Sequence, residues 1–325
     1  MSSEDEYLQI QRASVPPEAS GRRVDQVAAA LFPDYSRSLL ARWLSSGALT
    51  VDGQAAKPKH KLRGGELLCL DVSRVPYENW SEPQAVDFDC VYEDEHLLVV
   101  NKPAGLVVHP GAGNLDGTLV NGLLAWRAAQ AELPRAGIVH RLDKDTSGLL
   151  LVAASLQALA GLSSAISERQ VARRYLALAH GQLVSAVTVD AALGRDPAVP
   201  TRQKVRDDGR PAVTHIRPLR TFAAHTLVEA KLETGRTHQI RVHMAHLGHP
   251  LIGDERYGGR PRQRSVAPTG MSAEALQSIA EFPRQALHAT ALQLAHPVSG
   301  QALDFEVEAP ADFQALQAVL GEAND

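Results

Sequence analysis

Residues 137–153 read GIVHRLDKDTSGLLLVA, with a short charged run between two apolar runs. The charged run begins with His140, Arg141 and Asp143. A short apolar run bounded by turn-type residues is typical of a buried strand, so we expect the charged residues in a loop on a rigid scaffold. Such loops often hold functional groups, but an Asp near an Arg is also common in ordinary tight turns. The loop alone leaves both interpretations open.

The surrounding sequence, from residue 89 to residue 312, predicts more strands than helices. The strands do not alternate strictly with helices, which favours an α+β domain with a largely antiparallel sheet. The clearest helices are expected at 156–167 and 237–247, the second with Thr237 as its N-cap. The expected strands are 97–101, 149–153, 175–180, 188–193, 213–219, 226–232, 286–294 and 303–308.

A smaller unit is expected at residues 20–75. Apolar residues at helical spacing from Val24 to Leu31 predict one helix, and Ser36 is a candidate N-cap for a second. Strands are expected at 49–51, before an Asp-Gly turn, and at 67–72.

The total of 325 residues fits two domains, since single domains usually hold about 100–200 residues. The acidic, proline-containing stretch 76–88 has no periodicity and is interpreted as a linker. Residues 1–19 and 313–325 are interpreted as tails, with a short helix within the C-terminal one.

The formal net charge of -4 hides a strong segregation of charge. Residues 35–65 hold six basic side chains and one acidic one, and residues 201–264 hold thirteen basic and six acidic. Their net charges are therefore +5 and +7. Residues 77–95 and 301–325 contain seven and six carboxylates and no Lys or Arg. Basic patches of this kind can attract phosphates, although each patch alone could equally be a solvated face.

The compartment is expected to be the cytoplasm. No stretch approaches the roughly 20 apolar residues that span a bilayer. The N-terminus is acidic and polar, unlike a signal peptide. Cys69 and Cys90 lack metal-type spacing and are expected to be reduced.

Residues 232–257 raise the question of a metal site. His243, His246 and His249 recur every third residue. A zinc site on one helix usually spaces its histidines four apart and adds a carboxylate or thiolate. Gly248 and Pro250 would also end the helix before His249. A packing or phosphate-facing role is therefore favoured. The glycine-containing loop 109–114 is a weak phosphate signature, because it lacks the strand–loop–helix context.

In combination, several blocks resemble the RluA family of pseudouridine synthases. They are GIVHRLDKDTSGL, the Arg-x-Tyr strand at 173–175, TGRTHQIRVHMAHLGHPLIGD and RQALHATALQLAHP, in the family's order and spacing. VYEDEHLLVVNKPAGLVVHPGAG resembles the family's opening strand and loop, and residues 20–75 resemble an S4-type RNA-binding domain. The resemblance covers residues 20–312. It implies an α+β catalytic domain with a mixed, largely antiparallel sheet and a central cleft, beside a small S4-like α/β domain.

The resemblance implies isomerisation of uridine to pseudouridine. Within the family, FPDYSRS, NKPAGLVVHPGAGN, PRAGIVHRLDKD and YGGRPR look most like the members that modify 23S ribosomal RNA at the helix 69 stem-loop. The implied partner is therefore this RNA or an assembling large ribosomal subunit. We also expect no membrane partner and a monomeric protein. The reaction involves no redox change or group transfer, so no cofactor or metal is expected. One departure is Arg173, where the family often has Lys.

The matching positions imply roles for individual residues. Asp143 is expected to be the catalytic carboxylate and Arg241 its cationic partner. Tyr175 is expected to stack on the flipped uracil and to assist loss of the C5 proton. Asp145 is assigned a structural role. Substrate contacts are expected from Leu287, Arg236, Arg141 and His140, the last two also shaping the loop, and RNA contacts of the S4-like unit from Arg37, Arg42, Lys57, Lys59 and Lys61.

Two alternatives from other classes stay open at this point. A non-catalytic S4-type RNA-binding protein predicts that Asp143→Asn leaves function intact. A metal-dependent hydrolase built on the histidines of 243–249 predicts stoichiometric zinc and sensitivity to a chelator. Neither explains why the Asp, Arg and Tyr motifs stand in the family's order.

Overall fold

The computed structural model describes residues 10–32, 35, 37–71, 82–110, 114–199, 201–258 and 271–322. The chain divides into two compact units, with the boundary between residues 79 and 80. Within the described residues, no helix is both long enough and apolar enough to cross a membrane.

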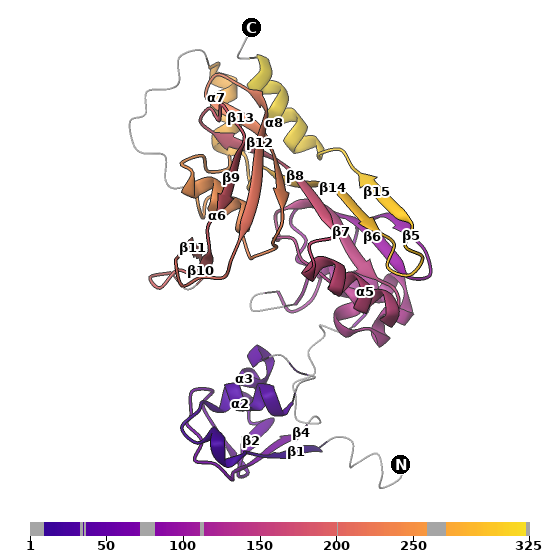
Figure 1. Ribbon diagram of the computed structural model, residues 1–325, viewed down its shortest axis with the longest axis vertical. Helices are drawn as coiled ribbons and strands as arrows, with labels where there is room; N and C mark the ends of the chain where they lie inside the picture. The colour runs from indigo at the N-terminus through magenta and orange to yellow at the C-terminus, as the bar shows by residue number, and fades with distance from the viewer. Residues whose placement is uncertain are drawn as a thin grey trace. The chain divides into compact units, whose positions relative to one another are not determined.

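The N-terminal unit is a small four-stranded antiparallel sheet with two helices (Figure 1). Its strands, in sheet order, are β1 (Ile10–Ser14), β4 (Leu67–Asp71), β2 (Leu49–Val51) and β3 (Gln54–Ala55). The helices are α2 (Val24–Leu31) and α3 (Arg37–Ser46), after a short 3-10 turn η1 (Pro17–Ala19). Apolar side chains of both helices and the sheet, including Val24, Leu40 and Leu68, form one core.

Most of the predicted elements of this unit are present. The Asp52-Gly53 turn has positive φ at both residues, 49° and 77°, as a type I′ hairpin requires. Ser36 lies outside the described residues. Residues 10–14 correct the predicted tail, because they pair with β4 as strand β1. The segment IQRAS has no clear apolar alternation, and its strand conformation depends on the neighbouring edge of β4.

The C-terminal unit is built on a nine-stranded mixed sheet (Figure 1). Its order is β5-β6-β7-β14-β8-β13-β12-β9, and β15 also pairs with β14. Among the described strand pairs of this sheet, only β7–β14 is parallel. The predicted α+β class with a largely antiparallel sheet is therefore confirmed. The strands are β5 (Asp89–Glu93), β6 (Leu97–Lys102), β7 (Ser147–Ala153), β8 (Ala172–His180), β9 (Val187–Asp190), β12 (Val213–Thr221), β13 (His225–Leu232), β14 (Leu287–Ala295) and β15 (Ala302–Glu306).

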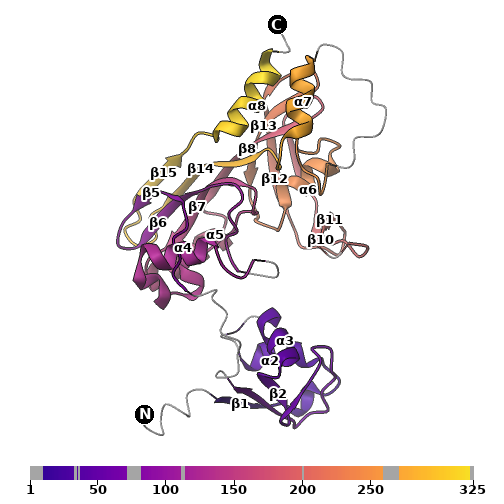
Figure 2. The ribbon, with the colours of Figure 1, turned by 180° about the vertical axis from the view of Figure 1, so that it is seen from behind.

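Helices cover both faces of the sheet around β7. Helix α5 (Leu156–Ser167), predicted at these bounds, packs on one face, and α4 (Leu119–Trp126) packs on the other (Figures 1 and 2). Two 3-10 turns, η4 (Ala128–Glu132) and η5 (Pro134–Gly137), connect α4 to the loop at residues 138–147. All seven residues of β7 are buried. This explains its continuous apolar sequence, since a strand covered on both faces needs no polar alternation.

The C-terminal segment corrects a second predicted tail. Helix α8 (Ala311–Glu322) buries Phe313, Leu316 and Leu320 against the sheet and lies beside α7 (Ala273–Glu281) (Figure 2). These apolar residues recur at helical spacing, so the helix has one apolar side despite its acidic composition. The predicted helix is present, and it belongs to the core.

Two further expectations need correction. The predicted strand 188–193 is two strands in different sheets, because β9 ends at Asp190 and β10 (Leu193–Arg195) pairs with β11 (Gln203–Val205). Residues 82–88, predicted as linker, are held on α4, where Asn121 Nδ2 donates to Glu82 O at 2.9 Å. Residues 76–81 of that linker lie outside the described residues.

Candidate active site

The HRLD loop, residues 138–147, is held by hydrogen bonds to two neighbouring segments. His140 Nε2 accepts a hydrogen bond from the backbone N–H of Leu151 at 2.9 Å. Arg284 Nη1 donates to Asp145 O at 3.2 Å, and Gln285 Nε2 donates to Thr146 Oγ1 at 3.1 Å. The loop is therefore fixed both to β7 and to the chain just before β14, which makes its geometry rigid.

Lys102, at the end of β6, also holds this loop in place. Its ammonium donates to three carbonyl oxygens, those of Pro103 at 2.7 Å and of Leu106 and Lys144 at 2.9 Å. The side chain is fully buried. Burial lowers its pKa to about 7, although Asp145 and Asp143 raise it. This cation joins β6 to the residue that directly follows Asp143.

Gly148 allows the loop to enter the sheet. Its φ is +110°, and a Cβ at this position would lie 2.2 Å from the carbonyl oxygen of Ala289. The β7 and β14 backbones approach here in their parallel register, with Ala289 opposite Gly148. Any other residue would push β7, which follows the Asp143 loop, away from β14, which begins at Leu287.

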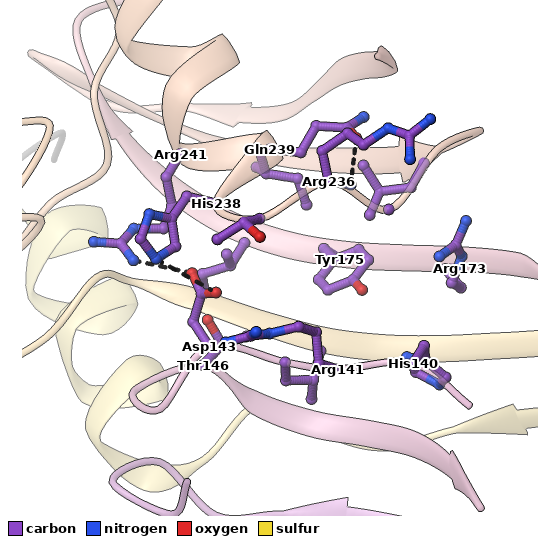
Figure 3. Close-up of a pocket in the computed structure, with 16 residues that line it drawn as sticks. His140, Arg141, Asp143, Thr146, Arg173, Tyr175, Arg236, His238, Gln239 and Arg241 are labelled. Atoms are coloured by element: carbon purple, nitrogen blue, oxygen red, sulfur yellow. Dashed lines mark hydrogen bonds and ion pairs between the residues drawn. The ribbon is translucent and has the colours of Figure 1, made fainter. Parts of the chain in front are cut away.

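Asp143 projects from this loop toward α6 (Gln239–His246) (Figure 3). Arg241 of that helix donates from Nη1 to Asp143 Oδ2 at 2.9 Å. The same guanidinium binds Asp254 through Nε and Nη2, at 2.7 and 2.8 Å. The Asp143 side chain is 15% exposed and that of Asp254 is fully buried. The structure thus brings together the predicted carboxylate and its predicted cationic partner.

Arg241 keeps its charge in this environment. Desolvation opposes ionisation, but the hydrogen bonds and charges of Asp254 and then Asp143 raise the pKa of the guanidinium. A buried ion pair is stable only when its geometry and remaining hydrogen bonds are good. The two-point contact with Asp254 meets that condition and leaves one nitrogen for Asp143.

A pocket opens beside Asp143. Tyr175 on β8 and Leu287 at the start of β14 form part of its wall, together with Leu232 and Ile240. Tyr175 is 6% exposed, and burial raises the pKa of its phenol, so the hydroxyl stays protonated near neutral pH. A flat apolar wall next to an anionic carboxylate fits a planar, polar ring.

Arg173 lies on the same face of β8 as Tyr175, two residues before it (Figure 3). It lines the pocket and is 4% exposed. Its Nε has no hydrogen-bond partner, and Nη2 reaches only the carbonyl of Glu233, at 3.5 Å. Across the described residues, no carboxylate lies within ion-pair distance of it. A buried, nearly unpaired cation is costly, so the pocket is electrostatically suited to an electron-rich ligand.

The other predicted pocket residues have different surroundings. Arg141 and Arg236 line the pocket with exposed side chains, and Arg236 Nε donates to Pro211 O at 3.2 Å. His140 also lines it, but burial lowers its pKa to about 3, and its Nε2 is occupied by Leu151 N–H. His140 is therefore a neutral loop-shaping residue. Asp145 offers its backbone carbonyl to Arg284, in line with a structural role.

This geometry belongs to a chain with clear relatives. Residues 96–246 match the model of the RNA pseudouridylate synthase family, and residues 22–68 match that of the S4 domain. The chain is 49% identical to a ribosomal large subunit pseudouridine synthase D of Xanthomonas campestris, over 99% of this chain and 96% of that protein. It is 46% identical to the protein of the same name from Escherichia coli, over 95% and 93%.

The chain belongs to the RNA pseudouridylate synthase family. Solved structures agree with this membership. The human RNA pseudouridylate synthase domain containing 1 matches with a TM-score of 0.54 and 28% identity, over 73% of this chain and 90% of that one. The human domain containing 4 protein matches with a TM-score of 0.55 and 26% identity, over 71% and 92%.

In this pseudouridylate synthase, α6 begins differently from the prediction. Its N-cap is His238, in the left-handed region at φ 57° and ψ 21°, and not Thr237. The buried Gln239 holds the preceding turn instead, because its Oε1 accepts from Thr234 Oγ1 and from Arg236 N at 2.8 and 2.9 Å. Gln239 thus fixes the turn before the helix, and the N-cap residue itself makes no side-chain capping hydrogen bond.

The histidines of 243–249 do not converge. His243 contacts Thr214 Oγ1 and Ala191 O, at 2.8 and 3.0 Å, and His249 contacts His180 O at 2.9 Å. His246 is exposed. The described residues contain no group of three or more side chains suited to a metal ion. These contacts support the packing role expected for the histidines.

Three residues around the Asp143–Arg241 pair were not predicted from sequence: His238, Asp254 and Tyr257. His238 Nε2 lies 3.8 Å from Asp143 Oδ1, and its Nδ1 lies 2.7 Å from the Tyr257 hydroxyl. All three fall within or just after the block TGRTHQIRVHMAHLGHPLIGD. The only signal for them was their place in that block, since residue type alone gives no role to a buried Asp or Tyr.

The S4 unit presents a basic loop between β3 and β4. Backbone hydrogen bonds from Val24 N to His60 O and from Leu62 N to Arg22 O fix this loop to the start of α2. Lys57, Lys59 and Lys61 are exposed on it. Arg37 is engaged by the buried Asp25, at 2.8 Å. Of the five predicted RNA contacts in this unit, the three lysines thus stand on a fixed, exposed loop, whereas Arg37 is paired.

Proposed function

We propose that this chain isomerises uridine to pseudouridine in RNA of the large ribosomal subunit, with Asp143 as the essential carboxylate. The observation that supports this most is the Asp143–Arg241 ion pair at the edge of a pocket walled by Tyr175 and Leu287. The bacterial relatives are named for the large ribosomal subunit, and they align over nearly the whole chain.

The chemistry needs an ionised carboxylate. The N1–C1′ bond breaks, the uracil turns, C5 bonds to C1′, the C5 proton leaves and N1 gains a proton. Asp143 could attack the sugar, attack the base or remove a sugar proton. All three routes need the anion, which Arg241 stabilises by charge and hydrogen bonding. The positions of both groups are set before substrate arrives.

Tyr175 and Leu287 would hold the base in the pocket. A stacked phenol ring lets uracil rotate in its plane while water is kept away. Burial raises the pKa of the Tyr175 phenol, and the protonated ring can stack on the base. Tyr175 would also assist loss of the C5 proton, as the family resemblance implies.

Entry of the base requires it to leave the RNA stack, at a cost of a few kcal/mol. Arg141 and Arg236 at the pocket and Lys57, Lys59 and Lys61 on the S4 unit would offset this cost through contacts with phosphates. Helix 69 is our specific proposal for the site in 23S RNA. We also propose a cytoplasmic monomer.

The test is tritium release from 23S RNA fragments labelled with 5-³H-uridine, including a helix 69 fragment. Wild type should release tritium, and Asp143→Asn should release none while binding the RNA normally. Asp145→Asn is the matched control from the same loop and should stay active. Binding without release by folded wild type would indicate a non-catalytic RNA-binding protein. Loss of wild-type release on chelation would instead support a metal-dependent enzyme.

A further inference from the structure

His238 has an unusual backbone conformation for a residue with a side chain. At φ 57° it occupies the left-handed region, which is unfavourable for a residue other than glycine. Helix capping does not explain the residue, because its side chain makes no capping hydrogen bond to α6. Strain that the local helix does not require suggests that the side chain is needed where it points.

The imidazole points between Tyr257 and Asp143 (Figure 3 shows the Asp143 side). The Tyr257 hydroxyl accepts a hydrogen bond from the backbone N–H of Gln203 at 2.9 Å. The Tyr257 hydroxyl can also donate its own proton. Within the described residues, the acceptor available for this proton is His238 Nδ1, 2.7 Å away. Burial raises the pKa of the Tyr257 phenol, so this proton is retained.

A hydroxyl that donates to Nδ1 fixes the tautomer of His238. The neutral ring then has its proton on Nε2, the nitrogen that faces Asp143 Oδ1 at 3.8 Å. Burial has the largest effect on the pKa of His238 and lowers it. The carboxylates of Asp143 and Asp254 raise this pKa, and the guanidinium groups of Arg241 and Arg256 lower it. The net direction is downward, so the ring offers a neutral N–H donor.

The two oxygens of Asp143 therefore face different donors. Arg241 holds Oδ2 at 2.9 Å, and His238 faces Oδ1. The distance of 3.8 Å is longer than a hydrogen bond, as is common before substrate binds and tightens such contacts. A neutral second donor orients the carboxylate without adding a second positive charge that would weaken it as a nucleophile or base.

The turn at residues 254–257 positions both donors, Arg241 and His238. Asp254 Oδ1 accepts the backbone N–H of Tyr257 at 3.1 Å, and the same carboxylate holds Arg241. The Tyr257 ring packs edge-on against His238, with centroids 5.5 Å apart, and lies 5.2 Å from the Arg241 guanidinium carbon. Residues 254–257 are thus the shared support of the two groups that flank Asp143.

We propose that His238 is a positioning residue for Asp143, and that Tyr257 sets the imidazole tautomer in which Nε2–H faces the carboxylate. The proposal rests on the isomerase function proposed above. It assigns His238 no proton transfer: the ring orients Asp143 Oδ1, and Tyr257 acts through His238.

The experiment measures single-turnover tritium release, RNA affinity and melting temperature across pH 5.5–8.5. His238→Asn keeps a residue that tolerates the left-handed region but is too short to reach Asp143. It should lower the single-turnover rate about 10- to 100-fold, the equivalent of one charge-assisted hydrogen bond, with unchanged affinity. His238→Gln, whose amide reaches about as far as Nε2, should recover most of the rate. His246→Asn, on the exposed side of the same helix, should match wild type.

Tyr257→Phe separates positioning from folding. Without the hydroxyl, Nδ1 can be protonated more easily, so the rate of this variant should fall toward acid pH at a higher pH than that of wild type. A reduction by the same factor at every pH would overturn the tautomer assignment. A wild-type rate in His238→Asn would overturn the positioning role. If wild type itself released no tritium, the proposed function and this inference would fail together.

Discussion

Asp254 binds Arg241 at two points, with Nε at 2.7 Å and Nη2 at 2.8 Å, while Arg241 gives its remaining nitrogen to Asp143. Asp143, the proposed catalytic carboxylate, is therefore held by a cation that is itself held by a second, fully buried carboxylate. This arrangement fixes the direction in which Asp143 points, and it predicts unequal effects for similar substitutions.

Arg241→Lys should inactivate the enzyme although it keeps the charge. A single ammonium cannot bind Asp254 at two points and also reach Asp143. Asp254→Asn should lower the free energy of unfolding by about 3–5 kcal/mol, since removing one partner leaves a buried charge. Tritium release measures the activity of Arg241→Lys, and urea unfolding measures the stability of Asp254→Asn. Glu255→Gln, at the exposed neighbouring position, is the control, and an unchanged stability of Asp254→Asn would contradict the prediction.

Arg173→Met should make the protein more stable and bind RNA less well. The guanidinium is buried and nearly unpaired, so its replacement by an apolar chain removes a desolvation cost. Arg174→Met is the matched control from the other face of β8, where Arg174 pairs with Glu229 at 3.6 Å. The control should be slightly less stable and bind RNA normally. Melting temperature measures the stability, and filter binding measures the RNA affinity. A lower melting temperature for Arg173→Met would contradict the interpretation of Arg173 as a buried, nearly unpaired cation.

The protein should lose stability between pH 6.5 and pH 4. Burial lowers the pKa of His109, His225 and His288 from 6.5 to about 4. The unfolded chain takes up protons in this window and the folded one does not, so stability falls as pH falls, by about 1.4 kcal/mol per pH unit for each group. Urea unfolding at several pH values should show this slope. His225→Gln should reduce it, whereas an identical slope in that variant would show that His225 does not contribute.

Gly148→Ala should abolish folding or activity, unlike Gly300→Ala. Both glycines have positive φ, +110° and +75°. A Cβ on Gly148 would meet the Ala289 carbonyl at 2.2 Å, whereas a Cβ on Gly300 would meet nothing within 4 Å. The Gly300 variant should therefore lose only the backbone term of about 1 kcal/mol. Equal losses of stability in the two variants would mean that close approach of β7 and β14 is not required.

Replacing Lys57, Lys59 and Lys61 together by Gln should weaken RNA binding. The reaction rate of the bound RNA should not change. The three side chains are exposed on a loop that backbone hydrogen bonds fix to α2. If each neutralises one phosphate, the slope of log affinity against log salt should fall by about 2–3. The single-turnover rate at saturating enzyme should match wild type. Arg12→Gln, on β1, is the control, and an unchanged salt slope in the triple variant would argue against phosphate contacts by this loop.

The sequence was informative where periodicity or a motif was strong. The apolar run 149–153 and the helix 156–167 were found because both have continuous or regular apolar spacing. Strand β1 was missed because IQRAS has no such spacing and depends on a partner more than fifty residues away. The order of the sheet, with its one parallel pair, is a long-range property that local patterns do not encode.

The residues of the candidate site also fall into a group that the sequence predicted and a group that it did not. Asp143, Arg241 and Tyr175 were placed through the family resemblance, and the structure brings the carboxylate and guanidinium to 2.9 Å. The supports behind them were not predicted. Asp254 and Tyr257 matter because of what they contact, and their contacts depend on a turn whose position is fixed only in three dimensions.

The parallel pairing of β7 with β14 has a consequence for how the enzyme is made. Gly148 and Ala289 are neighbours in the sheet although about 140 residues separate them along the chain. Closing so distant a contact is slow, because the entropy of the intervening segment must be lost first. During translation, the Asp143 loop leaves the ribosome long before Arg284, Gln285 and Leu287 are synthesised. The nascent protein therefore contains Asp143, the proposed reactive carboxylate, early but completes the surrounding pocket only near the end of synthesis. We therefore expect an incomplete chain to be inactive on RNA.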